Sequence, residues 1–320
     1  MLKKLKPKKT KVPKISFLIA AHNEEKIIRE CVETIANLPS KKHEIIVGLD
    51  GCTDRTEEIV KELAEKHKNL RYFSLNLRQG KNAVINEIIK KARGEIVVIN
   101  DADWIFISKD KKSFDKFFSV FDNPKIGGIA ESFPAEWHKD RIENSDIGYK
   151  MEAYSSFLWY EFQKEKFTYE KEGLRCLKEP TMFLTNIFRK NLYKENLSLG
   201  DDFERTHYIM SQGYKIVQFD NDKMPRIKTT YNTLKIKDIF RLKIRTAVAR
   251  AQLNERNLQN ITIGNYYFPF IVYALKESMK KGLNWFGIIL FWIILSSTAA
   301  FFAGFKKIGT KEGWKIRQKR

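Results

Sequence analysis

The sequence has few cysteines and none of the spacings that bind zinc or form a disulfide framework. Cys31, Cys52 and Cys176 are widely separated, no CxxC pair occurs, and no histidine cluster lies near them. A disulfide-stapled fold and a cysteine zinc site are therefore not expected, and a reducing compartment is favoured. No internal repeat occurs, and the lysine-rich residues before Ile15 lack the apolar stretch of a secretory signal peptide.

Acidic residues are also outnumbered, with 39 Asp and Glu against 59 Lys and Arg, which gives a formal net charge of +20. The excess is concentrated at the two ends, because residues 1–14 carry +7 and residues 276–320 carry +8. A nucleic-acid-binding protein more often spreads its basic residues over a folded face. Charge at the termini instead favours anionic lipid headgroups, at roughly 1 kcal/mol per basic residue near the surface. We therefore expect a membrane lipid bilayer as a partner and no nucleic acid.

One long stretch has no charge at all, the 23 residues from Leu283 to Phe305. This length suffices to cross a bilayer with some tilt, so a transmembrane helix is predicted, with a buried core helix as the alternative. The apolar stretch from Ile261 to Leu275 has only 15 residues and is interpreted as an interfacial or re-entrant segment. A single span would place the basic tail, residues 306–320, on the far side of the membrane, whereas a hairpin would return it to the cytoplasm.

The sequence between these ends alternates short apolar runs with stretches of helical periodicity. Strands are predicted at 15–21, 44–49, 70–75 and 95–99, and helices at 24–38, 56–66 and 82–92. This alternation is typical of βαβ units, so we expect an α/β fold with a mostly parallel sheet and helices on both faces. In the less regular remainder, strands are predicted at 126–133, 181–189 and 215–219 and helices at 145–166, 203–212 and 237–258.

The most specific feature is the segment GEIVVINDADW, in which a short β-branched run stops at Asp101 and Asp103. A run of this kind is typical of a strand buried on both faces. Two carboxylates just past such a strand can share one hard divalent cation and the phosphates it carries, which favours Mg²⁺ or Mn²⁺ over zinc. In isolation the same residues could be a solvated acidic loop.

Other polar clusters follow the predicted strands at the edge where an open α/β sheet gathers functional groups. Asn23 and Glu24 follow the first strand, Asp50 ends the second, and Lys81 opens the third helix region. Taken singly, each cluster could be a helix cap or a turn. Their shared position and their order along the chain favour a single site.

Three segments together carry a family resemblance: ISFLIAAHNEE, EIIVGLDGCTD and RQGKNAVINEIIKKARGEIVVINDAD. They resemble the nucleotide-sugar-binding half of the family 2 glycosyltransferases, which have the GT-A fold and act by inversion. The resemblance implies a set of donor-binding residues: Asn23, Glu24, Asp50, Lys81, Asp101 and Arg245. It implies in particular that Asp50 contacts the nucleotide base, and that Asp101 and Asp103 hold Mg²⁺ or Mn²⁺ on the donor diphosphate.

The acceptor half of the site is expected where acidic residues open the helix predicted after Gly200. Asp201 and Asp202 could serve only as first-turn acids that interact with the helix dipole. The stretch LGDDFERTHYIMSQGYKIVQFD nevertheless resembles the family's Glu-Asp motif, with Asp201 where Glu is usual and Asp202 at the catalytic base. The resemblance therefore implies that Asp202 takes the proton of the acceptor hydroxyl in a single in-line displacement with inversion.

Arg245 resembles the arginine of the family's Gln-x-x-Arg-Trp motif, but Leu242 and Thr246 replace the other two motif residues. That departure argues against a processive polysaccharide synthase. Arg241, Lys243 and Arg245 would approach a diphosphate on one interpretation. On the other, they belong to a solvated basic helix that faces lipid headgroups.

These observations predict a GT-A domain at residues 15–258, between a basic tail at 1–14 and a membrane-associated region at 259–320. The predicted activity is metal-dependent, inverting transfer of a single sugar from a nucleotide-sugar donor. The catalytic domain is expected on the cytoplasmic side of the cell membrane, where a lipid-linked acceptor would suit it. A polyprenyl-phosphate sugar synthase ranks second, because its usual acidic, proline-rich continuation is replaced by residues 104–107, WIFI. A non-catalytic membrane scaffold that retains the nucleotide-binding fold is the alternative from another class.

Overall fold

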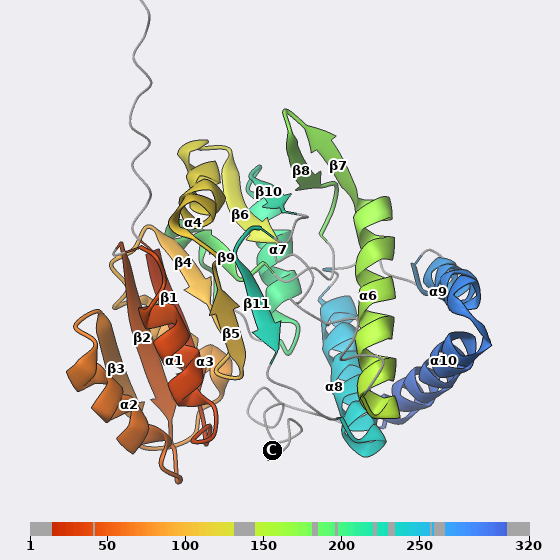
Figure 1. The fold of residues 1–320 in the computed structure, drawn as a ribbon, viewed down its shortest axis with the longest axis horizontal. Coiled ribbons are helices and arrows are strands. Elements are labelled where there is room, and N and C mark those ends of the chain that lie inside the picture. Colours follow the sequence, from red (N-terminus) through yellow and green to blue (C-terminus); the bar gives the residue numbers. More distant parts are fainter. Residues whose placement is uncertain are drawn as a thin grey trace, which may run out of the picture.

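The computed structural model describes residues 15–40, 42–130, 145–180, 185–195, 198–219, 223–229, 234–256, 258 and 266–305. Its first half is a run of alternating strands and helices (Figure 1). The elements are β1 (Ile15–Ala21), α1 (Ile28–Ala36), β2 (His43–Asp50), α2 (Thr56–Lys66), β3 (Leu70–Leu75), α3 (Lys81–Ile89) and β4 (Ile96–Ile99). The four strands are parallel neighbours in the order β3-β2-β1-β4, which confirms the predicted parallel sheet.

The second half extends this sheet to nine strands in the order β3-β2-β1-β4-β9-β6-β10-β8-β7. Its strands are β6 (Ile126–Ala130), β7 (Thr168–Lys171), β8 (Leu174–Leu177), β9 (Ile187–Arg189) and β10 (Lys215–Gln218). β9 lies between β4 and β6 and is antiparallel to both, whereas β10 runs parallel to β6. The sheet is therefore mixed in its second half, and the β7–β8 hairpin at its edge was not predicted.

A small second sheet is formed by β5 (Trp104–Ile107) and β11 (Arg226–Thr229), which pair antiparallel. β5 begins directly after Asp103 and was not predicted as a strand. The helix α4 (Lys111–Phe118) and the short 3-10 helix η1 (Ser119–Asp122) follow it. The predicted helix at 24–38 is shorter than expected, because residues before Ile28 form turns that hold the loop after β1.

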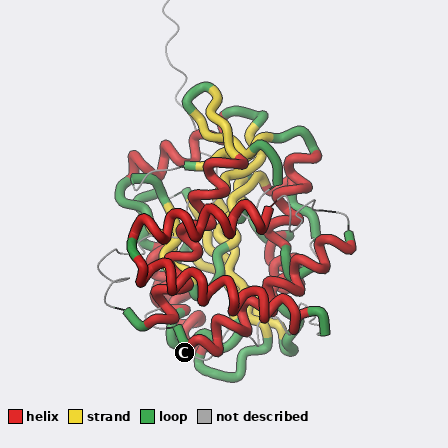
Figure 2. Tube along the Cα trace, turned by 90° about the vertical axis from the view of Figure 1, so that its right-hand side faces the viewer, coloured by secondary structure: helices red, strands yellow, loops and turns green. Residues whose placement is uncertain are grey.

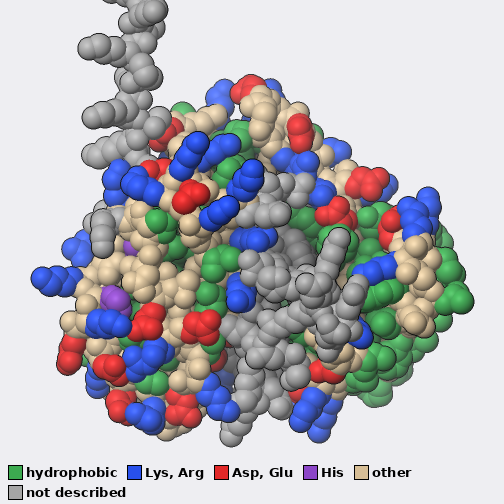
Figure 3. Space-filling model, in the orientation of Figure 1, with side chains coloured by type: hydrophobic (Ala, Val, Ile, Leu, Met, Phe, Trp, Pro, Cys, Tyr) green, Lys and Arg blue, Asp and Glu red, His purple; other side chains and the backbone are tan. Residues whose placement is uncertain are grey.

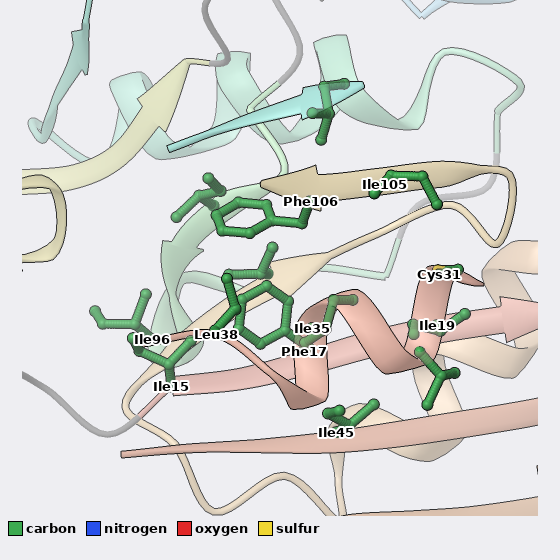
Figure 4. Close-up of a cluster of buried hydrophobic side chains, with 14 of the residues drawn as sticks. Ile15, Phe17, Ile19, Cys31, Ile35, Leu38, Ile45, Ile96, Ile105 and Phe106 are labelled. Carbon is green, nitrogen blue, oxygen red and sulfur yellow. The ribbon is translucent and has the colours of Figure 1, made fainter. Parts of the chain in front are cut away.

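The core lies on both faces of the sheet because alternate side chains of β1 point to opposite sides. Ile15, Phe17 and Ile19 face α1, α2, α4 and β5, whereas Leu18 and Ala20 face α3. Figure 4 shows the ring of Phe106, from β5, above Phe17 in the first of these clusters. The two rings meet edge to face with centroids 5.1 Å apart, so the small second sheet closes one face of the main sheet.

Replacing Phe17 with alanine should destabilise the protein strongly, because its side chain is fully buried and packs on the rings of Phe106 and His43. A cavity of this kind typically costs about 3–5 kcal/mol in the free energy of unfolding. Denaturant unfolding of the full chain measures the change, with Phe17→Leu as the smaller, matched alteration. A loss below about 1 kcal/mol for Phe17→Ala would contradict this packing.

Several later helices form a layer beside the sheet, visible in front of the strands in Figure 2. They are α6 (Ile147–Phe167), α8 (Ile236–Glu255), α9 (Phe268–Lys281) and α10 (Leu283–Ala303). α10 packs against α6, α8 and α9. It corresponds to the charge-free stretch of the sequence, while α9 contains the second half of the predicted interfacial segment; residues 261–265 of that segment lie outside the described residues.

Candidate active site

The strands β1, β2 and β4 end at the same edge of the sheet. Ala21 of β1 pairs with Leu49 of β2, and Leu18 of β1 pairs with Ile99 of β4. The loops that follow these three strands therefore start side by side, which is the edge where open α/β sheets bind ligands. Of the predicted donor-binding residues, Asn23, Glu24 and Asp101 lie in these loops, and Asp50 is the last residue of β2.

Asn23 links the loop after β1 to the loop after β2. Its amide nitrogen donates to Oγ1 of Thr53 at 3.0 Å, and its carbonyl oxygen accepts from the Thr53 backbone N–H at 2.8 Å. Its φ of 56° lies in the left-handed region, which asparagine tolerates better than most residues. Beside it, the backbone N–H of Glu24 donates to Oγ1 of Thr56 at 2.7 Å. The structure thus gives Asn23 and Glu24 a loop-holding role, and their contact with a nucleotide stays a prediction.

Asp50 anchors the loop that leads into α3. Its side chain is fully buried, and its two carboxylate oxygens accept hydrogen bonds from the backbone N–H groups of Gln79, at 2.6 Å, and Gly80, at 2.8 Å. Lys81 follows immediately as the first residue of α3. Asp50 therefore fixes the position of Lys81. A contact of Asp50 with the nucleotide base, as the resemblance implies, would be additional to these two hydrogen bonds.

Gly51 is required for this approach of the two loops. Its φ of +59° lies in the left-handed region, and a Cβ at this position would lie 2.6 Å from the backbone nitrogen of Arg78. Any larger residue would push the loop of Arg78 away from β2. The glycine in the DGC segment thus serves the close contact between loops.

The turn that carries Asp101 and Asp103 is held by Asn100. The Asn100 amide nitrogen donates to the carbonyl oxygens of Asp101 and Trp104, both at 2.8 Å. Nζ of Lys81 lies 2.6 Å from Oδ1 of Asp101, with both side chains largely buried. The structure therefore brings Lys81 and Asp101 together, as the sequence predicted, and gives Asn100 a structural role that the sequence analysis did not assign.

The two carboxylates at this turn are oxygen ligands of the kind that a hard divalent cation prefers. Among the described residues, no group of three or more His, Cys, Asp and Glu side chains could hold a metal ion by itself. Asp101 and Asp103 supply two carboxylates, and Mg²⁺ commonly uses one or two carboxylates with substrate phosphates and waters. This donor set matches an ion that arrives with its substrate better than a permanently bound structural metal.

The helix α7 (Asp201–Ser211) carries the predicted base and is held by a buried arginine. Nη2 of Arg205 lies 2.9 Å from Oδ2 of Asp201, and Nη1 donates to the carbonyl oxygen of Thr185 and to Oδ1 of Asn186. The Arg205 side chain is only 2% exposed. Since Thr185 and Asn186 lead into β9, this arginine joins the start of α7 to the centre of the sheet.

Asp201 and Asp202 have opposite pKa shifts. Burial alone would raise the pKa of Asp201, but the positive charges of Lys81 and Arg205 together lower it. Burial, followed by the negative charge of Asp201, raises the pKa of Asp202 to about 6. A hydrogen bond from the Phe203 N–H to Oδ1 of Asp202, at 2.9 Å, opposes this rise without cancelling it.

The same electrostatic interactions show that the two halves of the site are close. Lys81 acts on the carboxyl groups of both Asp201 and Asp202, and Asp101 acts on Asp201. The start of α7 therefore faces the Lys81–Asp101 pair. That Asp202 and the Asp-x-Asp turn serve one site stays a prediction. Arg205 was missed although its spacing of four residues from Asp201 is typical of a helical ion pair.

The loop before α7 is held from two sides. Nδ2 of Asn82, on α3, donates to the carbonyl oxygen of Ser198, and Oε1 of Gln252, on α8, accepts from the Leu199 N–H at 3.0 Å. Arg245 lies seven residues before Gln252 on α8, so it shares that face of the helix at about 10 Å along its axis. Its role in donor binding stays a prediction.

The sequence matches the profile of "Glycosyl transferase family 2" over residues 16–188, more than half of the chain. The chain belongs to glycosyl transferase family 2. The matched segment contains β1 to β4, the Asp-x-Asp turn and β9. It ends before α7, so the position of Asp202 rests on the structure and on the motif around it.

Individual relatives match parts of the chain to different extents. A poly-beta-1,6-N-acetyl-D-glucosamine synthase from Staphylococcus epidermidis is 32% identical over 125 residues, 39% of this chain and 30% of that protein. The chain thus matches less than a third of the length of the first curated relatives. A dolichyl N-acetyl-alpha-D-glucosaminyl phosphate 3-beta-D-2,3-diacetamido-2,3-dideoxy-beta-D-glucuronosyltransferase from Methanococcus voltae is 25% identical over 84% of this chain and 82% of its own length.

Among solved structures, the mannosyltransferase PcManGT from Pyrobaculum calidifontis, in complex with GDP-Man and Mn2+, superposes with a TM-score of 0.55. The match covers 96% of this chain and 79% of that one at 16% sequence identity. At this identity the likeness concerns the fold, and it confirms the predicted GT-A architecture. It includes the C-terminal helices as well as the sheet, since it covers nearly the whole chain.

Proposed function

We propose that the protein is an inverting, metal-dependent glycosyltransferase that transfers one sugar from a nucleotide-sugar donor to a lipid-linked acceptor at a membrane. The observation that carries the proposal is the position of Asp202. It opens α7 as a carboxyl group with a pKa raised to about 6, within the electrostatic reach of Lys81, which is itself paired with Asp101. Family membership and the GT-A fold support the same conclusion.

Asp101, Asp103 and Lys81 would bind the donor diphosphate. A bound Mg²⁺ or Mn²⁺ would neutralise the negative charge that develops on the leaving diphosphate. Asp101 and Asp103 would hold that ion, and the Lys81 ammonium would stand beside the phosphates. Asp50 keeps Lys81 in place through the backbone of Gln79 and Gly80. Asn23 and Glu24 would border the nucleotide from the loop after β1.

Asp202 would act on the acceptor. The acceptor oxygen attacks the anomeric carbon while the bond from that carbon to the diphosphate oxygen breaks, and the hydroxyl proton passes to the Asp202 carboxylate. One displacement at one carbon inverts its configuration. A pKa of about 6 makes the carboxylate a better proton acceptor than an ordinary aspartate while leaving it ionised at neutral pH.

The relative from Methanococcus voltae supports a lipid-linked acceptor, because its name describes transfer to a dolichyl phosphate that already carries a sugar. This favours addition to a lipid-linked sugar over the synthesis of a polyprenyl-phosphate sugar. The active site would face the cytoplasm, where nucleotide sugars are made. The GT-A domain would end near residue 258, and the membrane-associated region would follow.

Thermal stabilisation of the purified full chain by a panel of intact nucleotide sugars, with and without Mn²⁺, tests this function. We expect one donor class to raise the melting temperature only when the metal is present, and that donor to be hydrolysed slowly without acceptor. Stabilisation by Mn²⁺ alone would indicate a different metal role. If no donor binds at any metal concentration, the protein is a scaffold that keeps the fold without the activity.

The activity should fall as the pH drops through about 6, because Asp202 accepts a proton only in its ionised form. Replacing Asp201 with asparagine removes the negative charge that helps to raise the pKa of Asp202. The positive charge of Arg205, which lowers that pKa, is then no longer offset by Asp201. The acidic limb of the log kcat/KM profile should therefore move to lower pH in Asp201→Asn. An unchanged or higher apparent pKa in that variant would show that another group controls the limb.

A further inference from the structure

The outer face of α10 carries a largely apolar stripe. Its exposed large side chains are one, three or seven residues apart and so share one broad side of the helix: Leu283, Leu290, Phe291, Ile294, Phe301, Phe302 and, just beyond the helix, Phe305. The neighbouring α9 adds exposed Phe268, Val272 and Met279. Figure 3 shows hydrophobic side chains gathered on this side of the molecule, at the right of the view.

The opposite face of α10 is packed along its whole length. Near its start Ile289 is buried in a cluster with Phe270 of α9 and Leu158 of α6. Near its end Ala299 and Ala303 are buried against Ile244 and Val248 of α8. Only 17% of the most apolar 18-residue segment of α10 is buried, however, so α10 does not have the burial of a core helix. It is a surface helix attached by one side.

This attachment conflicts with a transmembrane position. A helix of 21 residues is about 30 Å long, the thickness of the hydrocarbon core. Its partner α8 runs beside it and carries seven ionisable residues: Lys237, Asp238, Arg241, Lys243, Arg245, Arg250 and Glu255. If α10 crossed a bilayer in this packing, α8 would enter the hydrocarbon with its charges, which is costly. A helix lying in the membrane plane exposes only its outer face to lipid.

The charges around the stripe favour an anionic lipid surface as its occupant. Lys276, Lys280 and Lys281 are exposed at the end of α9 that leads into α10. The ammonium group of Lys281 lies 3.8 Å from the ring centroid of Trp285, and such pairs of lysine and tryptophan suit the headgroup region. A second copy of the chain would present the same positive charges and be repelled. The basic residues of the sequence after Phe305 add to this attraction.

We propose that α9 and α10 form an in-plane docking surface for an anionic bilayer, with the apolar stripe inserted into one leaflet and no membrane span. This replaces the transmembrane helix expected from the sequence, and it rests on the proposed function only for the presence of a membrane-bound acceptor. It keeps the C-terminal tail on the same side of the membrane as the catalytic domain.

Spin labels on the stripe test the proposal through their depth in the membrane. The full chain, with its three cysteines replaced by alanine, receives single labels at Leu283→Cys, Leu290→Cys, Ile294→Cys and Phe301→Cys in phosphatidylcholine–phosphatidylglycerol vesicles. An in-plane helix gives one shared, shallow depth at all four positions. A span gives its greatest depth near Ile294 with shallow ends, and this result would overturn the proposal, as would four water-exposed labels.

Substitutions on the stripe give a second measurement. The double change Ile294→Glu and Phe301→Glu should weaken binding to these vesicles by about tenfold or more, while Ile294→Leu should bind like the unaltered chain. Donor hydrolysis in solution should persist in both variants, because α10 lies away from β4 and β5, which flank the Asp-x-Asp turn (Figure 1). Loss of membrane docking can therefore be told apart from an absence of transferase activity. The docking surface would be refuted if the unaltered chain does not bind vesicles and instead forms a dimer, without detergent, that the double change dissociates.

Discussion

Asp202→Asn should lower kcat by about 10²- to 10⁴-fold while leaving donor binding intact, because the amide cannot take the acceptor proton. The change is nearly isosteric, and the hydrogen bond that Oδ1 accepts from the Phe203 N–H can still form. The measurement is steady-state transfer to the acceptor, together with thermal stabilisation by the donor and Mn²⁺. The stabilisation should match that of the unaltered chain.

The control for this change is Asp122→Asn, at an exposed aspartate at the end of η1. It alters one acidic residue in the same way without touching the start of α7, so its kcat should be unchanged. If Asp202→Asn keeps a kcat within a few-fold of the control, Asp202 is only an acid in the first turn of α7, and another group accepts the proton.

Asp103→Asn should lower transfer by about 10²- to 10³-fold and raise the Mn²⁺ concentration needed for half-maximal activity, because it removes one of the two carboxylates proposed to bind the metal. Asp103 is 7% exposed in the turn held by Asn100, so the substitution should act locally. The measurement is a Mn²⁺ titration of transfer and of donor hydrolysis. High Mn²⁺ should recover part of the lost activity.

A folding defect is separated from a metal defect by following unfolding of Asp103→Asn without metal. We expect its stability to stay close to that of the unaltered chain, because asparagine has nearly the same size and keeps an oxygen that can accept a hydrogen bond. An unchanged Mn²⁺ dependence in this variant would show that Asp103 is not a metal ligand. The proposed donor site would then need a different set of ligands.

The first half of the fold could be predicted from the sequence because its strands are buried on both faces. Such strands appear as short apolar runs between amphipathic helices, and β1 to β4 lie where those runs are. Whether a strand runs parallel or antiparallel to its neighbours cannot be read from such a pattern. Residues 187–189 were predicted as extended, but only the structure shows that β9 runs antiparallel between β4 and β6.

The candidate site divides in a similar way. Asp50, Lys81 and Asp101 were proposed as site residues because each lies at or just after the end of a predicted strand or at the start of a helix, whereas Asp202 was proposed from the resemblance of its segment to the family's Glu-Asp motif. The side chains that hold these residues were missed, because their partners are distant in the sequence. Arg205 bonds to residues about twenty positions earlier, and no local pattern indicates those two bonds; only its ion pair with Asp201, four residues before it, has a spacing that the sequence shows.

The C-terminal helix shows the limit of an apolar pattern. The charge-free stretch predicted a helix of nearly the observed length, from Leu283 to Ala303. It gave no indication of which side would pack on α8, because both faces of α10 are apolar. Length and composition alone are equally compatible with a helix that crosses a bilayer and with one that lies along its surface.

The position of α8 has a consequence for turnover. One part of this helix packs on α10 through Ile244 and Val248, and its last turns hold the loop before α7 through the bond between Gln252 and Leu199. One helix, α8, therefore connects α10, which we propose to face lipid, to the loop that leads into Asp201 and Asp202. If α9 and α10 dock on a bilayer as proposed, that contact would align Asp202, the proposed proton acceptor, and transfer should be faster on vesicles than with the same acceptor dispersed in detergent.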